Sequence, residues 1–258
     1  MNKIMKKLAI IGANESLECF YKQAKKLGYY LIGIAYEKGA VCKKYCDKFY
    51  PISFADKDSV LEVCKTENID GITSFSLESA LPTVIYVAQN MGLVSNSFEC
   101  AKKLENKFTM RKCFTAAGIP NPLYKLVKTT MDLDEIDMLF PCIVKPVDSG
   151  GSQGVTKVND RKELHNAFQR AIKYSKNGGV IIEQFVDGRE FSVEYISHNG
   201  NHYHLQITDK VTSGEPYFVE LAHHQPAQIS VELMSRMKNM VEKALTALDI
   251  ENSASHTE

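Results

Sequence analysis

Residues 140–155 join an apolar strand to a glycine-rich loop, and they constrain the fold more than any other segment of the chain. Lys145 lies near the end of the strand. The loop that follows contains Ser149, Gly150, Gly151, Ser152, Gln153 and Gly154. Glycines let backbone N–H groups turn toward an anion, while lysine adds a positive charge and serine adds hydroxyl donors. The segment therefore predicts a loop that binds nucleotide phosphates.

A plainer interpretation of the same segment is a β-hairpin in which the glycines only form the turn. The Walker A sequence G-x-x-x-x-G-K-[ST] does not occur in the 258 residues, so a P-loop of that type is excluded. The choice between hairpin and phosphate loop therefore depends on motifs elsewhere in the chain.

The composition excludes several classes of function. Lys+Arg and Asp+Glu each number 31, so no overall positive field attracts nucleic acid or an anionic membrane. No apolar run approaches the ~20 residues of a transmembrane helix, and the run at residues 8–11 is too short for a signal peptide. The seven scattered cysteines fit a reducing compartment. We expect a cytoplasmic protein that contacts neither nucleic acid nor membrane.

The first 95 residues alternate apolar strands with amphipathic helices. Strands are expected at residues 7–12, 30–35 and 71–75, and helices at residues 15–27, 57–67 and 79–91. This alternation predicts an α/β domain with a parallel, doubly wound sheet. An NAD site is not expected, because the first turn has the single Gly12 instead of G-x-G-x-x-G. Nor do Cys42 and Cys46 predict zinc, since further ligands are not near them in sequence.

From residue 180 the pattern changes to an antiparallel sheet with helices, which predicts an α+β fold for this half of the chain. Residues 190–196 alternate polar and apolar side chains, and Asn199-Gly200 then marks a hairpin turn. Helices are expected at residues 97–118, 132–139, 160–174 and 230–248. Strands are expected at residues 124–127, 141–147, 155–158, 180–186, 190–196, 202–211, 217–222 and 253–258.

Five motifs follow one another along the chain, at residues 106–107, 118–122, 140–146, 149–154 and 182–194. Their order and spacing resemble the ATP-grasp superfamily, in its carboxylate–amine ligase branch, which is similar to biotin carboxylase and carbamoyl-phosphate synthetase. The resemblance covers essentially the whole chain. It implies a Rossmann-like pre-ATP-grasp domain at residues 1–95, an N-terminal ATP-grasp subdomain with the glycine-rich lid at 96–179, and a C-terminal subdomain at 180–258.

The resemblance also implies which residues hold the phosphates and the metal. Lys107 and Lys145 would contact ATP phosphates, and residues 149–154 would form a mobile lid over them. Lys210 would contact the γ-phosphate or the substrate, with an exposed hairpin lysine as its plain alternative. Glu258 matches the first of two carboxylates that usually hold Mg²⁺.

The adenosine half of ATP is assigned by the same resemblance. Glu183 would meet the adenine amino group, and Glu190 would accept hydrogen bonds from the ribose hydroxyls. Gln184, Phe185 and Val186 would offer backbone groups at a strand edge. Independently of any family, cations for phosphate, acceptors for a sugar and an apolar slot are what a nucleotide needs.

The implied reaction is ATP-dependent ligation, in which a carboxylate becomes an acyl phosphate that an amine then attacks. The implied partners are ATP, Mg²⁺, and a small carboxylate and amine, with a homodimer left open. The second acidic metal ligand and an arginine for the acceptor do not follow Glu258, so we expect a fragment that binds nucleotide weakly and does not complete turnover. Two alternatives stay open: a carboxylase or carbamoyl-phosphate synthetase-like enzyme that uses bicarbonate, and a non-catalytic nucleotide-binding module.

Overall fold

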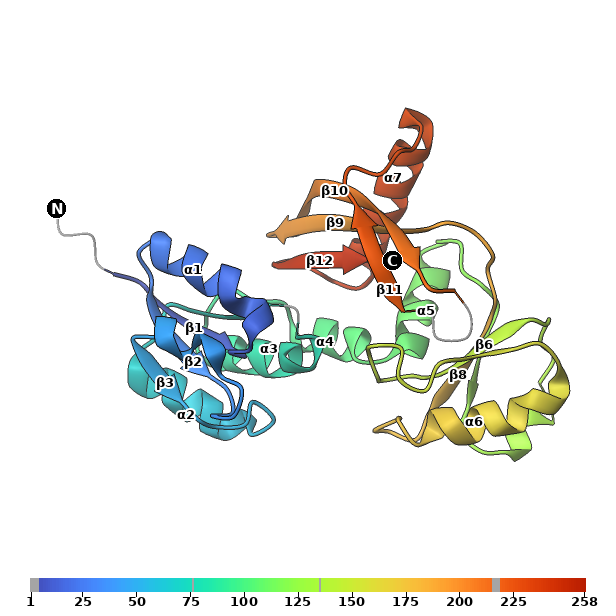
Figure 1. The fold of residues 1–258 in the computed structure, drawn as a ribbon, viewed down its shortest axis with the longest axis horizontal. Helices are drawn as coiled ribbons and strands as arrows, with labels where there is room; N and C mark the ends of the chain where they lie inside the picture. Colours follow the sequence, from blue (N-terminus) through green and yellow to red (C-terminus); the bar gives the residue numbers. More distant parts are fainter. Residues whose placement is uncertain (1–4, 76, 135, 215–218) are drawn as a thin grey trace. The chain divides into compact units, whose positions relative to one another are not determined.

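A computed structural model describes residues 5–75, 77–134, 136–214 and 219–258. The chain divides into two compact units, Met1–Ala101 and Lys102–Glu258, and each is described by itself (Figure 1). Among the helices in the described ranges, none is both long and apolar enough to cross a membrane.

The first unit contains a four-stranded parallel sheet in the order β3-β2-β1-β4. The predicted parallel α/β domain is thereby confirmed, although the short strand β3 was not expected. The strands are β1 (Lys7–Ile11), β2 (Tyr30–Ile34), β3 (Lys48–Tyr50) and β4 (Gly71–Ser74). The helices are α1 (Glu18–Lys26), α2 (Lys57–Glu67) and α3 (Leu81–Asn90), with 3₁₀ turns at Glu15–Leu17, Val41–Tyr45 and Glu78–Ala80.

Helices cover both faces of this sheet because its strands are apolar on both sides. Tyr21 of α1 is fully buried in a cluster with Ile10 and Leu31 from the strands. Val60 of α2 packs in a second cluster with Ile11 and with residues of α3. A parallel sheet buried on both faces is the expected consequence of strand–helix–strand connections.

Two helices follow, where one helix over residues 97–118 was predicted. Helix α4 (Phe98–Leu104) contains the last residues of the first unit, and α5 (Lys107–Ala116) lies in the second. The prediction was wrong at Asn106, which has extended backbone angles and accepts a hydrogen bond from the Thr109 N–H at 3.1 Å. This is an N-cap, so a new helix begins at Lys107. The cap therefore places Lys107 in the first turn of α5.

Two antiparallel sheets form the rest of the second unit, as the α+β prediction required. The first has the order β5-β8-β6-β7, and α6 covers one face with Leu164 and Phe168 in the shared core. Its strands are β5 (Tyr124–Val127), β6 (Cys142–Pro146), β7 (Thr156–Val158) and β8 (Val180–Gln184), and α6 spans Leu164–Ile172 after a 3₁₀ turn at Arg161–Glu163.

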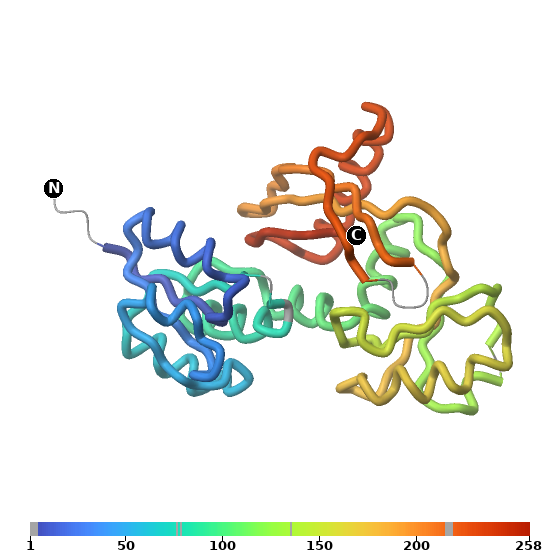
Figure 2. The backbone as a smooth tube through the Cα atoms, viewed as in Figure 1, coloured from blue at the N-terminus to red at the C-terminus, as the bar shows by residue number. Residues whose placement is uncertain are grey.

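The other sheet has the order β11-β10-β9-β12, and α7 packs on it through Tyr195, whose hydroxyl donates to the Glu242 carboxylate at 3.0 Å. Figure 2 shows the red end of the chain returning beside the strand that follows residue 190, as the β12–β9 pairing requires. The elements are β9 (Glu190–His198), β10 (Asn201–Thr212), β11 (Glu220–His224), β12 (Ser253–Thr257) and α7 (Val231–Ala247).

Two local predictions fail or fall outside the described residues. Residue 135 lies outside the described residues, and the rest of the helix expected at 132–139 is replaced by a 3₁₀ turn at Met131–Leu133, because the Asp132 carboxylate accepts hydrogen bonds from the N–H groups of Lys128 and Thr129. It therefore closes the preceding turn instead of starting a helix. Part of the strand expected at 217–222 lies outside the described residues, and β11 begins at Glu220.

Candidate functional site

A buried carboxylate shared by two cations lies on the first sheet of the second unit. Glu183 on the central strand β8 is only 5% exposed. Lys145 on the neighbouring strand β6 donates to Glu183 Oε2 at 2.5 Å. Arg111 on α5 donates from Nε to Glu183 Oε1 at 2.7 Å and from a terminal nitrogen to Oε2 at 3.4 Å. We call Lys145, Glu183 and Arg111 the cationic triad.

The triad carries a net positive charge. Burial raises the pKa of Glu183, but the hydrogen bond from Arg111 and the charge of Lys145 outweigh that effect, so the pKa lies below its usual range. The carboxylate is therefore ionised at neutral pH and binds two cations. One negative and two positive groups leave one positive charge, which is suited to phosphate oxygens.

The glycine-rich loop joins β6 to β7, and these strands pair antiparallel, so the hairpin interpretation is correct for the topology. Gly154 has φ +73°, and a Cβ atom at this position would lie 2.9 Å from the Tyr174 ring. Lys107 donates to the Ser149 carbonyl at 2.6 Å, and the Lys107 N–H donates to the Val147 carbonyl at 2.8 Å. Helix α5 therefore contacts both the loop and Glu183.

The outer part of the loop, Gly150, Gly151, Ser152 and Gln153, is exposed. Gly151 and Ser152 both have positive φ, at +63° and +54°. Left-handed backbone next to exposed N–H groups is the geometry of an anion-binding loop. That these residues contact phosphate stays a prediction.

The expected strand edge for adenine is not an edge. β8 lies between β5 and β6, and its register pairs Glu183 with both Tyr124 and Ile143. The N–H groups of Gln184 and Phe185 already donate to backbone carbonyls, at 2.8 and 3.1 Å. These two N–H groups are therefore used within the fold, as is usual for a central strand and the residue after it. Val186 is 69% exposed, and the contact of residues 184–186 with adenine stays a prediction.

The predicted side-chain contacts to adenine and ribose stay predictions too. The Glu183 carboxylate, assigned to the adenine amino group, faces the two cations of the triad. Glu190 is exposed at the first residue of β9, opposite Lys210 in the strand register.

A second charged cluster lies on the other sheet and has the opposite composition. Lys210 on β10 is 8% exposed. Its ammonium contacts the Glu220 carboxylate at 2.5 Å and also forms an ion pair with Glu258. Burial lowers the pKa of Lys210, but the hydrogen bonds that its ammonium donates to the two carboxylates outweigh burial and raise the pKa above the usual value. We call Lys210, Glu220 and Glu258 the anionic triad, because one lysine is shared by two carboxylates.

The anionic triad fits a magnesium ion only together with other oxygen donors. The Glu258 side chain is 59% exposed, and His256 lies between it and Glu194, with nitrogen–oxygen distances of 3.5 and 3.0 Å. Within the described ranges, no group of three His, Cys, Asp or Glu side chains could hold a metal ion. Mg²⁺ commonly takes one or two carboxylates and completes its octahedron with phosphates and water. Glu258 therefore fits a magnesium ion delivered with a nucleotide.

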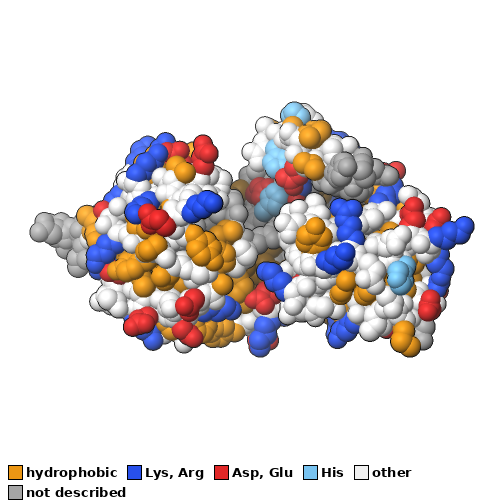
Figure 3. Space-filling view, turned by 60° about the horizontal axis from the view of Figure 1, so that its bottom comes forward, with side chains coloured by type: hydrophobic (Ala, Val, Ile, Leu, Met, Phe, Trp, Pro, Cys, Tyr) orange, Lys and Arg blue, Asp and Glu red, His pale blue; other side chains and the backbone are white. Residues whose placement is uncertain are grey.

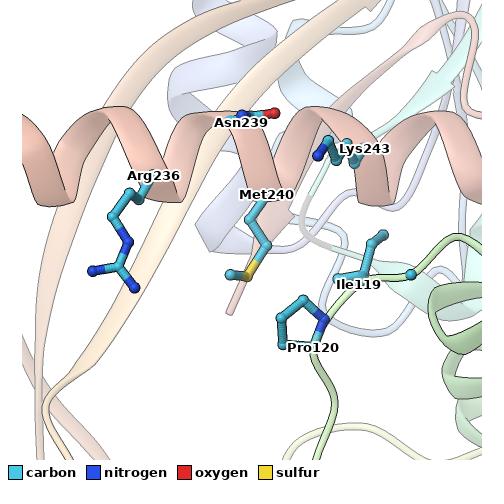
Figure 4. Close-up of a pocket in the computed structure, with 7 residues that line it drawn as sticks. Ile119, Pro120, Arg236, Asn239, Met240 and Lys243 are labelled. Atoms are coloured by element: carbon cyan, nitrogen blue, oxygen red, sulfur yellow. The ribbon is translucent and has the colours of Figure 1, made fainter.

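A shallow pocket of about 190 Å³ lies apart from both triads, between α7 and the turn at residues 118–120. Figure 4 shows Met240 pointing toward Pro120, with Arg236 and Lys243 at opposite ends of the group. The surface charges of the molecule are mixed in sign. The face in Figure 3 shows Lys and Arg side chains (blue) interspersed with Asp and Glu side chains (red), in agreement with the balanced composition.

Sequence reasoning found four of the six triad residues as site residues and missed the role of two. Arg111 lies within the helix predicted at residues 97–118 and Glu220 within the strand predicted at 217–222, and neither was assigned a role there. A signal for Arg111 existed: it is four residues after Lys107, so both lie on one face of a helix. Glu220 offered no such signal, because only the β10–β11 pairing brings it to Lys210.

Comparison with known proteins agrees with this architecture. Residues 138–258 match the family described as ATP-grasp domain. A D-alanine–D-alanine ligase of Thermoanaerobacter sp. (strain X514) is 32% identical over 222 residues, which are 80% of this chain and 57% of that protein. The crystal structure of an L-amino acid ligase from Bacillus licheniformis has a TM-score of 0.82 at 28% identity, covering 99% of this chain and 63% of that one.

The biotin carboxylase domain of Hydrogenobacter thermophilus 2-oxoglutarate carboxylase, solved with MgADP, ADP and bicarbonate, shares the fold. Its TM-score is 0.81 at 17% identity, covering 98% of this chain and 60% of that one. A parallel α/β unit followed by two antiparallel sheets is thus the shared fold. Residues 138–258 thus match the ATP-grasp domain family, and the chain is similar to a D-alanine–D-alanine ligase and to an L-amino acid ligase. It spans 57% of the Thermoanaerobacter ligase and 63% of the Bacillus licheniformis ligase.

Proposed function

We propose that the protein is an ATP-dependent ligase that joins a carboxylate to an amine, with amino acids as the substrate class. The observation that carries this proposal is the cationic triad next to the glycine-rich loop. Lys145 and Arg111 share one ionised carboxylate, while Lys107 on the same helix as Arg111 bonds to the loop. Amino acids are proposed because the relatives at 32% and 28% identity are named as amino-acid ligases.

In the proposed reaction, a substrate carboxylate oxygen attacks the γ-phosphorus of ATP, and ADP leaves. The resulting acyl phosphate is attacked by the amine, which loses a proton and displaces inorganic phosphate. Lys107 and Lys145 would neutralise phosphate oxygens and hold them in line, which is the main protein contribution to phosphoryl transfer. Residues 149–154 would close over the phosphates and exclude water, so that the acyl phosphate is not hydrolysed.

Glu258 would hold Mg²⁺ together with phosphate oxygens, and Lys210 would contact the γ-phosphate or the substrate. When bound, the metal ion would add positive charge against the phosphate oxygens. Glu183 and Glu190 would take the adenine and ribose positions that the sequence predicts. The chain would form three functional parts, at residues 1–95, 96–179 and 180–258.

Phosphate release from MgATP tests the proposal and separates it from its alternatives. The purified chain is given the twenty amino acids singly and in pairs, and bicarbonate in a parallel series, after MgATP binding has been measured by calorimetry. We expect nucleotide binding. Phosphate release that requires amino acids would support the ligase and overturn the expectation that residues 1–258 do not complete turnover. Release with bicarbonate alone would favour the carboxylase-like alternative. Nucleotide binding without release in either series would agree with that expectation and with a non-catalytic module, and absence of nucleotide binding would overturn the ATP site.

A further inference from the structure

We propose that Arg111 is a positioning residue for the nucleotide phosphates. It keeps the Glu183 carboxylate from neutralising Lys145, so that the Lys145 ammonium stays available to an anion. This inference rests on the proposed ATP site and adds to it a residue that acts through Glu183.

The geometry of the contact supports a dedicated partner for Glu183. The guanidinium reaches both carboxylate oxygens, Oε1 at 2.7 Å and Oε2 at 3.4 Å, whereas Lys145 contacts Oε2 alone. A planar guanidinium that contacts both oxygens is a stronger and more directional partner than an ammonium. Both oxygens of the Glu183 carboxylate therefore keep a cationic partner when Lys145 moves away.

The burial of Glu183 explains why such a partner is needed. If Lys145 were the sole cation beside it, the two would form a neutral pair. A phosphate could recruit Lys145 only by leaving a nearly buried carboxylate unpaired, which carries a large desolvation cost. With Arg111 in place, the carboxylate stays paired while the ammonium turns toward phosphate.

Neighbouring residues hold Arg111 in this orientation. A terminal guanidinium nitrogen lies 3.5 Å from the Asn121 side-chain oxygen, and the Asn121 amide donates to the Ile119 carbonyl at 2.9 Å. One turn earlier on α5, Lys107 bonds to the Ser149 carbonyl of the loop. The 118–122 motif thus orients Arg111, and α5 links Glu183 to the glycine-rich loop.

The test compares the dissociation constant of MgATP, by calorimetry, for the wild-type chain and for Arg111→Gln, Arg111→Lys, Glu183→Gln and the double variant Arg111→Gln/Glu183→Gln. Arg111→Gln should weaken binding roughly tenfold, within the range for a charge-assisted hydrogen bond. Arg111→Lys keeps the charge but loses the guanidinium that contacts both oxygens, so its dissociation constant should lie between those of the wild type and Arg111→Gln. The double variant should recover most of the lost affinity, because Lys145 no longer faces a carboxylate.

The matched control is Arg170→Gln, which removes an exposed arginine from α6 in the same unit and should leave the dissociation constant unchanged. Thermal unfolding checks each variant, and if Arg111→Gln does not fold, Arg111→Lys and Glu183→Gln carry the comparison. Wild-type affinity in Arg111→Gln, or a double variant as weak as the single one, would overturn the role of Arg111 alone. A wild-type chain that does not bind MgATP would instead overturn the ATP site on which the inference rests.

Discussion

The two charged clusters of the second unit are built alike and have opposite net charge. On one sheet, a single buried glutamate binds two cations, and on the other, a single buried lysine binds two carboxylates. The first arrangement keeps one positive charge and the second keeps one negative charge. Both clusters contain a lysine, so the presence of a lysine does not decide which ion a cluster suits. The number of cationic side chains relative to carboxylates decides whether the cluster suits phosphate or a cation.

The clusters also differ in which member is buried. The Glu183 side chain is 6% exposed and its cations are 20% and 27% exposed, whereas Lys210 is 3% exposed and its carboxylates are 48% and 59% exposed. Removing a partner of a buried charge costs far more than removing an exposed one. Each cluster should therefore respond differently to neutral substitutions, which gives three tests of the comparison.

The largest effect should come from removing the shared carboxylate of the cationic triad. Glu183→Ala leaves two cations side by side in a partly buried place and should lower the free energy of unfolding by about 3 kcal/mol. Glu220→Ala removes one exposed carboxylate and leaves Lys210 paired with Glu258, so its cost should be about 0–1 kcal/mol. Urea denaturation of both variants measures the difference. Equal losses in the two variants would contradict the proposed asymmetry.

A smaller effect should follow from removing the phosphate-binding charge. Lys145→Ala should weaken MgATP binding by about 1–3 kcal/mol, which is the value of a charge-assisted hydrogen bond. Lys173→Ala removes an exposed lysine after α6 and serves as the control. Calorimetric titration with MgATP gives both values. Unchanged affinity in Lys145→Ala would mean that the positive charge of this triad does not serve phosphate.

The smallest effect should be the loss of metal dependence at the anionic triad. The wild-type chain should bind MgATP more tightly than ATP with EDTA, and Glu258→Gln should reduce that difference by roughly tenfold. Glu232→Gln, at an exposed position in the first turn of α7, should preserve the difference. Titrations with and without Mg²⁺ provide the comparison. If Glu258→Gln keeps the full metal effect, the carboxylate is not a magnesium ligand.

The sequence by itself determined the two fold classes and most of the elements. Alternating apolar runs and helical spacing reflect local side-chain period, so β5 was placed at Tyr124–Val127 and α2 at Lys57–Glu67 with the bounds later observed. It failed where a local hydrogen bond competes with periodicity, at the Asn106 cap and the Asp132 turn. A single polar residue that bonds to nearby backbone N–H groups can end or prevent a helix without changing the hydrophobic pattern, so the pattern alone does not reveal it.

The tertiary structure alone decided which charges meet. Lys145, Lys210 and Glu183 were recognised as polar residues of a nucleotide site. Glu220 lies ten positions from Lys210, and the other triad partners lie 38 to 72 positions away along the chain. Strand order makes β8 central, which removed the expected edge for adenine and brought Glu183 between β6 and α5. The interaction between two charges depends on their separation in space and not on their separation along the chain. The net charge of each triad could therefore be assigned only once the strand pairing was known.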